Sequence, residues 1–175
     1  ATTSAPAPAP TSSSSLLHPN GNTAKCLDVR GAVFANGTPV DIFDCNGTPA
    51  QNWVIAPGEG HVTLAGTGFC LDAGSSPANG VGMKIWQCFD NLPAQDWFYT
   101  GDDRVALTNQ GFCLDLTGGN LANGNQVQIW KCTDNDVNQV WTTSPGGSIN
   151  GTTSVLPPPS TSTTVVIPTS SLATN

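Results

Sequence analysis

The chain has 175 residues, enough for one domain of ordinary size, with 19 Gly, 14 Pro and only 10% charged residues. Its net charge is −7, and its five basic residues are scattered, so neither nucleic acid nor an anionic membrane surface is an expected partner. No apolar run approaches the roughly 18–20 residues needed to span a bilayer. The Gly- and Pro-rich composition favours turns and short strands, and therefore an all-β fold.

Composition divides the chain into three segments. Residues 1–15 are Ala, Pro, Ser and Thr alone, and residues 146–175 are rich in Ser, Thr and Pro. Such flanks cannot bury enough apolar surface to offset the entropy of ordering, so both are expected to be disordered, either as spacers or as O-glycosylated stalks. The small residues at the end of the chain would also suit a cleaved GPI-anchor signal, although a soluble form is the simpler interpretation. Residues 16–145 are the expected domain.

The domain repeats one pattern three times, over residues 16–58, 59–102 and 103–145. The pattern begins with Cys-Leu-Asp at Cys26, Cys70 and Cys113, and ends with Gln-x-Trp at Trp53, Trp97 and Trp141. Each copy carries a central Asn-Gly dipeptide, which accommodates the positive φ of a tight turn. One copy of about four short strands cannot bury its own apolar face. Three copies around an axis can close a small barrel and share one core.

The six cysteines fall two to a copy. The repeat favours pairing within each copy: Cys26–Cys45, Cys70–Cys88 and Cys113–Cys132. Disulfides form in an oxidising compartment, so we expect a secreted or cell-surface protein. Three Asn-Gly-Thr sequons agree with that location: Asn36, Asn46 and Asn150. Asn36 has a second explanation, because it also belongs to a turn dipeptide.

Neither a metal site nor an enzyme is expected. The chain has no Cys-x-x-Cys, and only His18 and His61 could supply imidazoles. No Ser, His and Asp order typical of a catalytic triad is apparent. The adjacent carboxylates of Asp102 and Asp103 lie in a charged sequence that is typical of a solvated hairpin turn. We therefore expect no catalysis, no metal and no cofactor.

Strand alternation in the third copy brings chemically useful side chains together. Leu114 and Leu116 share one face of a strand, and Val127 and Ile129 share one face of its partner, so these apolar sets should point into the core. The opposite faces then carry three neighbouring polar or aromatic groups: Asp115, Gln128 and Trp130. An exposed indole beside a carboxylate and an amide suits a sugar, whose C–H face packs on the ring while its hydroxyl groups hydrogen-bond. The alternative is a Trp that covers the disulfide beside a carboxylate that caps local N–H groups.

The Trp residues of the three Gln-x-Trp patterns have a different expected role. They recur too regularly for each of them to contact a ligand. We interpret Trp53, Trp97 and Trp141 as wedges in the shared core.

Together, these patterns resemble the ricin-B family of R-type lectins, also called carbohydrate-binding module family 13. The resemblance covers about residues 16–145 and rests on Cys-Leu-Asp, the apolar-x-Ile-Trp/Phe-x-Cys strand and Gln-x-Trp. It implies a β-trefoil that binds galactose, N-acetylgalactosamine or related glycans without catalysis. The Ser-, Thr- and Pro-rich flanks are similar to those of secreted fungal proteins.

The resemblance also implies which residues bind the sugar. The third copy matches the family's site throughout, at Asp115, Gln128, Trp130, Asn138 and Gln139. The second copy keeps Asp72, Trp86 and Gln95 but has Lys84 and Ala94 in place of the Gln and the Asn. The first copy keeps Asp28 and Gln51 but has Asp41, Phe43 and Ala50 at the other three positions.

The three predicted sites are therefore unequal. In the first copy, Asp28 and Asp41 should lie near each other, which disfavours a neutral sugar unless a cation bridges them. We expect the third copy to bind best, then the second, then the first. A trefoil protease inhibitor and a non-binding structural cell-surface protein remain as alternative functions.

Overall fold

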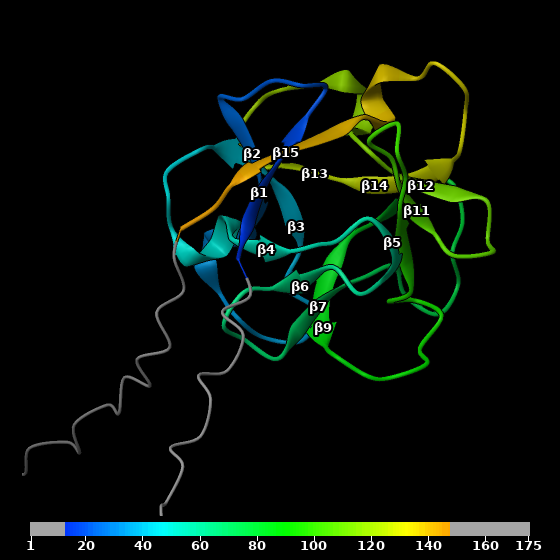
Figure 1. Cartoon of the computed structure of the whole chain (residues 1–175), viewed down its shortest axis with the longest axis horizontal. Helices are drawn as coiled ribbons and strands as arrows, with labels where there is room; N and C mark the ends of the chain where they lie inside the picture. The colour runs from blue at the N-terminus through cyan, green and yellow to red at the C-terminus, as the bar shows by residue number, and fades with distance from the viewer. Residues whose placement is uncertain (1–12, 148–175) are drawn as a thin grey trace, which may run out of the picture.

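The computed structural model describes residues 13–147, and within this range the chain consists of short strands, turns and single-turn 3-10 helices. Figure 1 shows three lobes of antiparallel strands around a common centre. This architecture confirms the expected all-β trefoil. The predictions made for residues 1–12 and 148–175 lie outside the described residues.

We call the elements of each repeat copy one lobe, although each of the three sheets takes strands from more than one copy. The first lobe contains β1 (Ser15–Pro19), β2 (Lys25–Val29), η1 (Arg30–Ala32), β3 (Val40–Asp44), η2 (Pro49–Gln51) and β4 (Trp53–Val54). The second contains β5 (Gly58–Gly60), β6 (Thr63–Leu64), β7 (Phe69–Asp72), β8 (Val81–Gly82), β9 (Lys84–Gln87) and β10 (Trp97–Tyr99). The third contains β11 (Val105–Leu107), β12 (Phe112–Asp115), η3 (Thr117–Gly119), β13 (Asn125–Gln126), β14 (Gln128–Lys131), η4 (Val137–Gln139) and β15 (Trp141–Pro145).

Strand pairing between lobes closes the barrel. β1 runs antiparallel to β15 over its whole length, so the first and last strands lie side by side (Figure 1). β4 pairs with β6 and β10 pairs with β11, which joins consecutive lobes. The pairing also includes residues that composition assigned to the flanks: Ser15 lies opposite Pro145, and the N–H of Gly146 donates to the carbonyl of Ser14.

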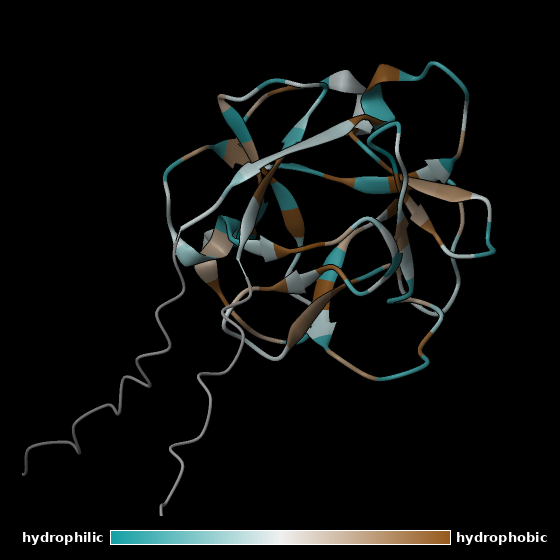
Figure 2. Cartoon of the chain, in the orientation of Figure 1, coloured by the Kyte–Doolittle hydropathy of each residue, from teal (hydrophilic) through white to brown (hydrophobic). Residues whose placement is uncertain are grey.

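The core is shared by all three lobes. Brown and teal segments alternate along the strands in Figure 2, as the alternation of buried and solvent-facing side chains requires. Trp53, Trp97 and Trp141 are fully buried, as expected of core wedges. Each indole Nε1 donates, at 3.0 Å, to a backbone carbonyl of its own lobe: Leu27, Leu71 and Leu114. Burying a Trp therefore leaves no indole N–H unsatisfied.

Disulfides join the two cysteines of each copy, as the repeat predicted: Cys26–Cys45, Cys70–Cys88 and Cys113–Cys132. In the chain-entropy model, closing a loop of this length stabilises a fold by roughly 3 kcal/mol. Within residues 13–147, no helix has the length and apolar character needed to cross a membrane.

Candidate carbohydrate-binding site

Strand register in the third lobe assembles the candidate site. β12 and β14 are antiparallel, with Cys113 opposite Trp130 and Asp115 opposite Gln128. Leu114 is buried in the core between these positions. The side chains of Asp115, Gln128 and Trp130 therefore share the face that strand alternation predicted.

These side chains surround a pocket of about 330 Å³. Its lining consists of Asp115, Gly118, Gln128, Trp130, Asp136 and Asn138. Asp115 is buried, whereas Trp130 is 41% exposed and presents its indole to solvent. The pocket therefore combines an aromatic surface with two carboxylates and two side-chain amides, the kinds of group that a sugar ring and its hydroxyls require.

Gln139 differs from the other predicted site residues because it has no exposed surface. Its Nε2 donates to Asp115 Oδ2 at 3.3 Å and to the carbonyl of Lys131 at 3.0 Å, and its Oε1 accepts from the N–H of Thr133 at 2.9 Å. The amide is thus fully used within the protein. Gln139 orients Asp115 and is screened from any ligand in the pocket.

The same arrangement recurs in the other lobes. Gln95 is fully buried and donates to Asp72 Oδ2 at 3.0 Å. Gln51 is also fully buried, with its Oε1 accepting from the N–H of Asn46 at 2.8 Å. All three Gln residues were expected at the sites, and the structure buries each of them fully.

Asp115 is held by two amides. Gln128 Nε2 donates to its Oδ1 at 2.9 Å, opposite the Gln139 contact. Burial raises the pKa of the Asp115 carboxyl, and the hydrogen bonds from Gln128 and Gln139 oppose that shift. A carboxylate oxygen with one amide donor still has a lone pair for a ligand hydroxyl. The site can therefore accept hydrogen bonds through Asp115.

Asn138 approaches the pocket over Gly119. A Cβ built on Gly119 would lie 2.9 Å from Asn138 Oδ1, closer than real contacts allow. The positive φ of Gly119, 63°, also favours glycine. The side-chain amide of Asn138 makes no hydrogen bond within the described part of the chain, which leaves both its donor and its acceptor for a ligand.

The second lobe has a pocket of about 270 Å³ that includes the predicted Asp72 and Trp86. Lys84 replaces the Gln of the third lobe, and its Nζ lies 2.8 Å from Asp72 Oδ1. The N–H of Gly74 donates to the same oxygen at 2.7 Å. Because Gln95 binds the other oxygen, Asp72 has three donors and less capacity for ligand hydroxyls than Asp115.

The first lobe has a smaller pocket of about 190 Å³, whose lining includes Asp28 and Phe43. Asp28 lies directly opposite Asp41 in the strand register, as the sequence predicted. A cation is also present, because Arg30 Nε lies 2.8 Å from Asp41 Oδ2. Burial raises the pKa of Asp28 to about 6. A hydrogen bond from the side chain of Gln51 opposes this shift, and the charge of Asp41 adds to it.

The Asn-Gly dipeptides connect neighbouring lobes, a role that their interpretation as local turns missed. Asn36 Oδ1 accepts from the N–H of Gln87 at 2.7 Å, in the second lobe. Asn79 Oδ1 accepts from the N–H of Lys131 at 2.7 Å, in the third. Asn123 Oδ1 accepts from the N–H of Asp44 at 3.0 Å, in the first. The sequence feature that could have indicated these contacts is the recurrence of Asn at the same position of every copy.

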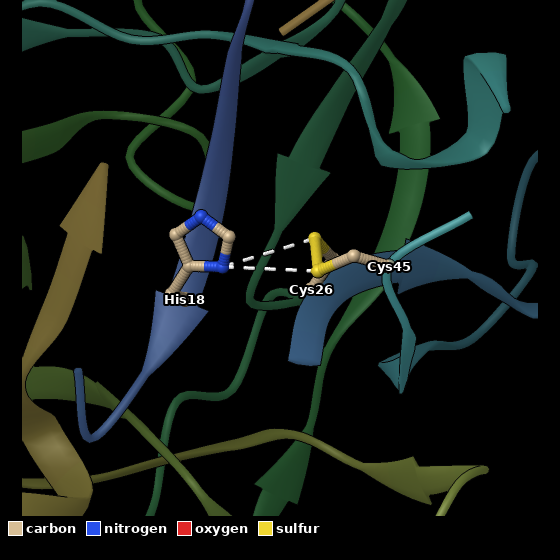
Figure 3. A group of neighbouring side chains, drawn as sticks. All are labelled: His18, Cys26 and Cys45. Atoms are coloured by element: carbon tan, nitrogen blue, oxygen red, sulfur yellow. Dashed lines mark hydrogen bonds between the residues drawn. A yellow bond between two sulfur atoms is a disulfide. The ribbon is translucent and has the colours of Figure 1, made fainter. Parts of the chain in front are cut away.

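Both histidines lie against disulfides. His18 Nδ1 is 3.8 Å from both sulfurs of the Cys26–Cys45 bridge (Figure 3), and His61 Nδ1 is 3.2 Å from Cys70 Sγ. Each imidazole and the adjacent cysteine pair have the proximity of metal ligands. The sulfurs form disulfides, however, and cysteine binds zinc as a free thiolate.

The carboxylates considered for catalysis lie in the hairpin between β10 and β11. Asp102 pairs with Arg104, and Asp103 has a positive φ of 62° in the turn. Tyr99 lies 2.8 Å from Asp103 Oδ1, and its hydroxyl is the donor. This environment agrees with the interpretation of a structural hairpin.

Comparison with known proteins identifies the same architecture. The sequence model of the ricin-type beta-trefoil lectin domain matches residues 15–151. No sequence among the curated proteins matches the chain. The structure is similar to ThreeFoil, a designed 3-fold symmetric protein, with a TM-score of 0.65 and 21% identity over 74% of this chain and 96% of that one.

Natural proteins with this fold include two lectins. The C-half of the earthworm R-type lectin, solved in complex with GalNAc, has a TM-score of 0.62 and 20% identity over 76% of this chain and 98% of that one. The Rhizoctonia solani agglutinin has a TM-score of 0.65 and 21% identity over 81% of this chain and 99% of that one. At these identities the likeness establishes the fold.

Proposed function

Because the chain belongs to the family of ricin-type beta-trefoil lectin domains, we propose that its third lobe binds galactose, N-acetylgalactosamine or a related glycan. The observation that carries this proposal is the meeting of Asp115, Gln128, Trp130 and Asn138 around one pocket. The choice of a galactose-type sugar rests on the family resemblance. The GalNAc in the earthworm complex is consistent with that choice.

The binding mode follows from the chemistry of the lining. The C–H face of a pyranose packs on the exposed indole of Trp130, which supplies contact area. Sugar hydroxyls donate to Asp115 and exchange hydrogen bonds with the amides of Gln128 and Asn138, which fixes the orientation of the ring. Gln139 keeps the Asp115 carboxylate in place from behind. Binding of this kind needs no catalytic group, so we propose a lectin without enzymatic activity.

The lobes are proposed to differ in affinity for a neutral sugar. The second lobe keeps an aromatic ring and a carboxylate, but that carboxylate is occupied by Lys84 and Gly74. The first lobe offers a smaller ring, Phe43, above two adjacent carboxylates. We therefore rank the third lobe first and the first lobe last.

The proposed setting is extracellular. Three disulfides are consistent with an oxidising compartment. The sequon residues Asn36 and Asn46 are exposed and remain candidates for N-glycosylation. Asn150 and the proposed GPI signal lie outside the described residues.

A sugar-affinity matrix tests the proposal. The native protein should be retained on immobilised galactose or N-acetylgalactosamine and eluted by the free sugar. The double variant Asp115→Asn, Trp130→Ala should lose at least about tenfold in affinity, because it removes a charge-assisted acceptor and the stacking surface together. Circular dichroism checks that the variant is folded.

Trp86→Ala is the matched control, because it removes the corresponding exposed indole of the second lobe. It should leave most of the retention intact. Unchanged retention of the Asp115→Asn, Trp130→Ala variant would refute the third-lobe site. Protease inhibition without any glycan binding would favour the inhibitor alternative.

A further inference from the structure

The three lobes differ in charge at one equivalent position. The residue directly opposite the Asp of each site is Gln128 in the third lobe, Lys84 in the second and Asp41 in the first. The opposing residue is therefore neutral, cationic and anionic in turn. A site that places a second carboxylate where a neutral sugar site has an amide should prefer a ligand of different charge.

The two carboxylates of the first lobe are incompletely compensated. Asp28 and Asp41 are 6% and 2% exposed, and Arg30 supplies the one cation in contact with them among the described residues. Arg30 binds only Asp41 Oδ2, while its Nη2 donates to the carbonyl of Gly124 at 3.2 Å. Asp41 Oδ1 is buried and has no hydrogen-bond partner within residues 13–147. A buried carboxylate oxygen without a partner is costly, so the site lacks a donor.

The other charged groups nearby are already engaged elsewhere. Lys25 and Asp44 pair with each other at the far end of β2 and β3, at 2.7 Å. His18 on β1 contacts the Cys26–Cys45 bridge (Figure 3). Its Nδ1 also lies 2.8 Å from the carbonyl oxygen of Lys25. The remaining packed elements, η2 and β13, carry no charged residue. The pair thus keeps an excess of negative charge, in a chain whose net charge is also −7.

An open pocket reaches one member of this pair, Asp28, while Asp41 lies behind it, outside the pocket lining. Asp28 lies in its lining, together with the side chain of Phe43, which is 41% exposed. Asn46 and Thr48 add polar groups to the rim. An aromatic face beside a carboxylate is the surface that holds a cation through combined ring and charge contacts.

We propose that the first lobe binds a cationic sugar, namely a 2-amino-2-deoxyhexose unit with a free ammonium group. The ammonium donates to Asp28 and supplies the missing positive charge beside Asp41, while the C–H face of the ring packs on Phe43. The N-acetylated form of the same sugar carries no charge and leaves the carboxylate pair uncompensated. The proposal concerns a different lobe from the proposed function and does not depend on it.

A bare divalent cation fits the site less well than an ammonium. Ca²⁺ takes about 6–8 oxygen ligands, whereas this site offers two carboxylates, one of which is bound to Arg30. An ammonium needs only a few acceptors and leaves the Arg30 contact in place.

The test uses the full chain with Asp115→Asn and Trp130→Ala, so that the third lobe does not contribute. Isothermal titration calorimetry at pH 7 and physiological salt compares the fully deacetylated and fully acetylated trimers of glucosamine. We expect the deacetylated trimer to bind at least about tenfold tighter, as for one charge-assisted hydrogen bond. Because burial raises the pKa of Asp28 to about 6, protonation of this carboxyl should weaken the binding of the deacetylated trimer between pH 7 and pH 5.

Two further variants separate this site from a general attraction to cations. Asp41→Asn should weaken the preference, because it leaves Asp28 as the one carboxylate of the site. Asp44→Asn removes the same charge from an exposed ion pair on the same strand and should leave the preference unchanged. Arg30→Gln should strengthen the binding of the deacetylated trimer, because it removes the cation that competes for the carboxylates. If the carboxylate pair had only a structural role, this variant would bring no gain in affinity. Three results would each overturn the proposal. They are equal affinity for the two trimers, equal effects of Asp41→Asn and Asp44→Asn, and displacement of the trimer by millimolar Ca²⁺.

Discussion

Asp28, Asp72 and Asp115 follow the same Cys-Leu pair in their lobes, yet their neighbours give them different chemistry. Two amides hold Asp115, a lysine and a backbone N–H hold Asp72, and Asp28 faces a second carboxylate. Burial is nearly equal for the three side chains. The difference in what each lobe can bind therefore comes from the residue opposite, since a buried carboxylate is sensitive to every nearby charge and donor.

Replacing Asp28 with Asn should stabilise the protein at pH 7. The pKa of Asp28 is raised to about 6, so the folded state holds this proton more tightly than the unfolded chain does. The protonated carboxyl therefore adds to the free energy of unfolding below about pH 4. This contribution is lost as the pH rises through 6. We expect Asp28→Asn to raise the free energy of unfolding by about 1–2 kcal/mol at pH 7, after allowance for solvent screening, and by much less at pH 4.

Chemical denaturation at the two pH values measures this difference. Asp44→Asn is the control, because Lys25 and Asn123 lower the pKa of that exposed carboxyl and its removal should bring no gain at pH 7. A loss of stability in Asp28→Asn that is the same at both pH values would contradict this description of the pair.

At the scale of elements, the Asn-Gly turns hold each binding strand from the neighbouring lobe. Asn79 fixes the end of β14 through the N–H of Lys131, next to Trp130. A Cβ on Gly80 would lie 3.7 Å from the Trp130 ring, so the turn also backs the indole. The aromatic surface of the third site thus depends on a turn of the second lobe.

Asn79→Ala should weaken both the fold and the third site. Losing one exposed side-chain hydrogen bond should cost about 1 kcal/mol of stability, and release of the β14 end should lower galactose affinity several-fold. Asn123→Ala makes the corresponding change on β3 of the first lobe. Because Asn123 also bonds the side chains of Lys25 and Asp44, this variant should cost at least as much stability, yet leave galactose affinity unchanged. Equal affinity losses in the two variants would refute the coupling. Thermal unfolding and calorimetric titration give the two quantities.

At the scale of the whole molecule, the threefold repeat made the architecture predictable. Strand alternation placed Leu114 and Ile129 in the core and Asp115 beside Gln128, because side chains in a strand alternate regardless of context. The sequence could not show that Gln139 is buried, since it lies in a 3-10 turn where alternation does not apply. Nor could it place Arg30 against Asp41, because Arg30 begins the 3-10 turn η1, where strand alternation does not apply.

Contacts between lobes were also beyond prediction from one copy. Each Asn-Gly dipeptide is locally a turn, and its partner strand lies more than forty residues away, as for Asn36 and Gln87. Gly118 lines the third pocket from within η3 and Asp136 from the residue before η4, and the two turns come together only through tertiary packing. The repeat therefore predicts the strands and their faces, while loop geometry completes the site.

The five Trp side chains allow a direct test of the central claim that sugar binds on the third lobe. Each indole N–H gives its own signal in an ¹⁵N-labelled protein. Titration with galactose should shift the signal of Trp130 first, shift Trp86 weakly or at higher concentration, and leave the signals of the three buried indoles unchanged: Trp53, Trp97 and Trp141. Saturable shifts that spare Trp130, or no shift at all with any galactose-type sugar, would contradict the account.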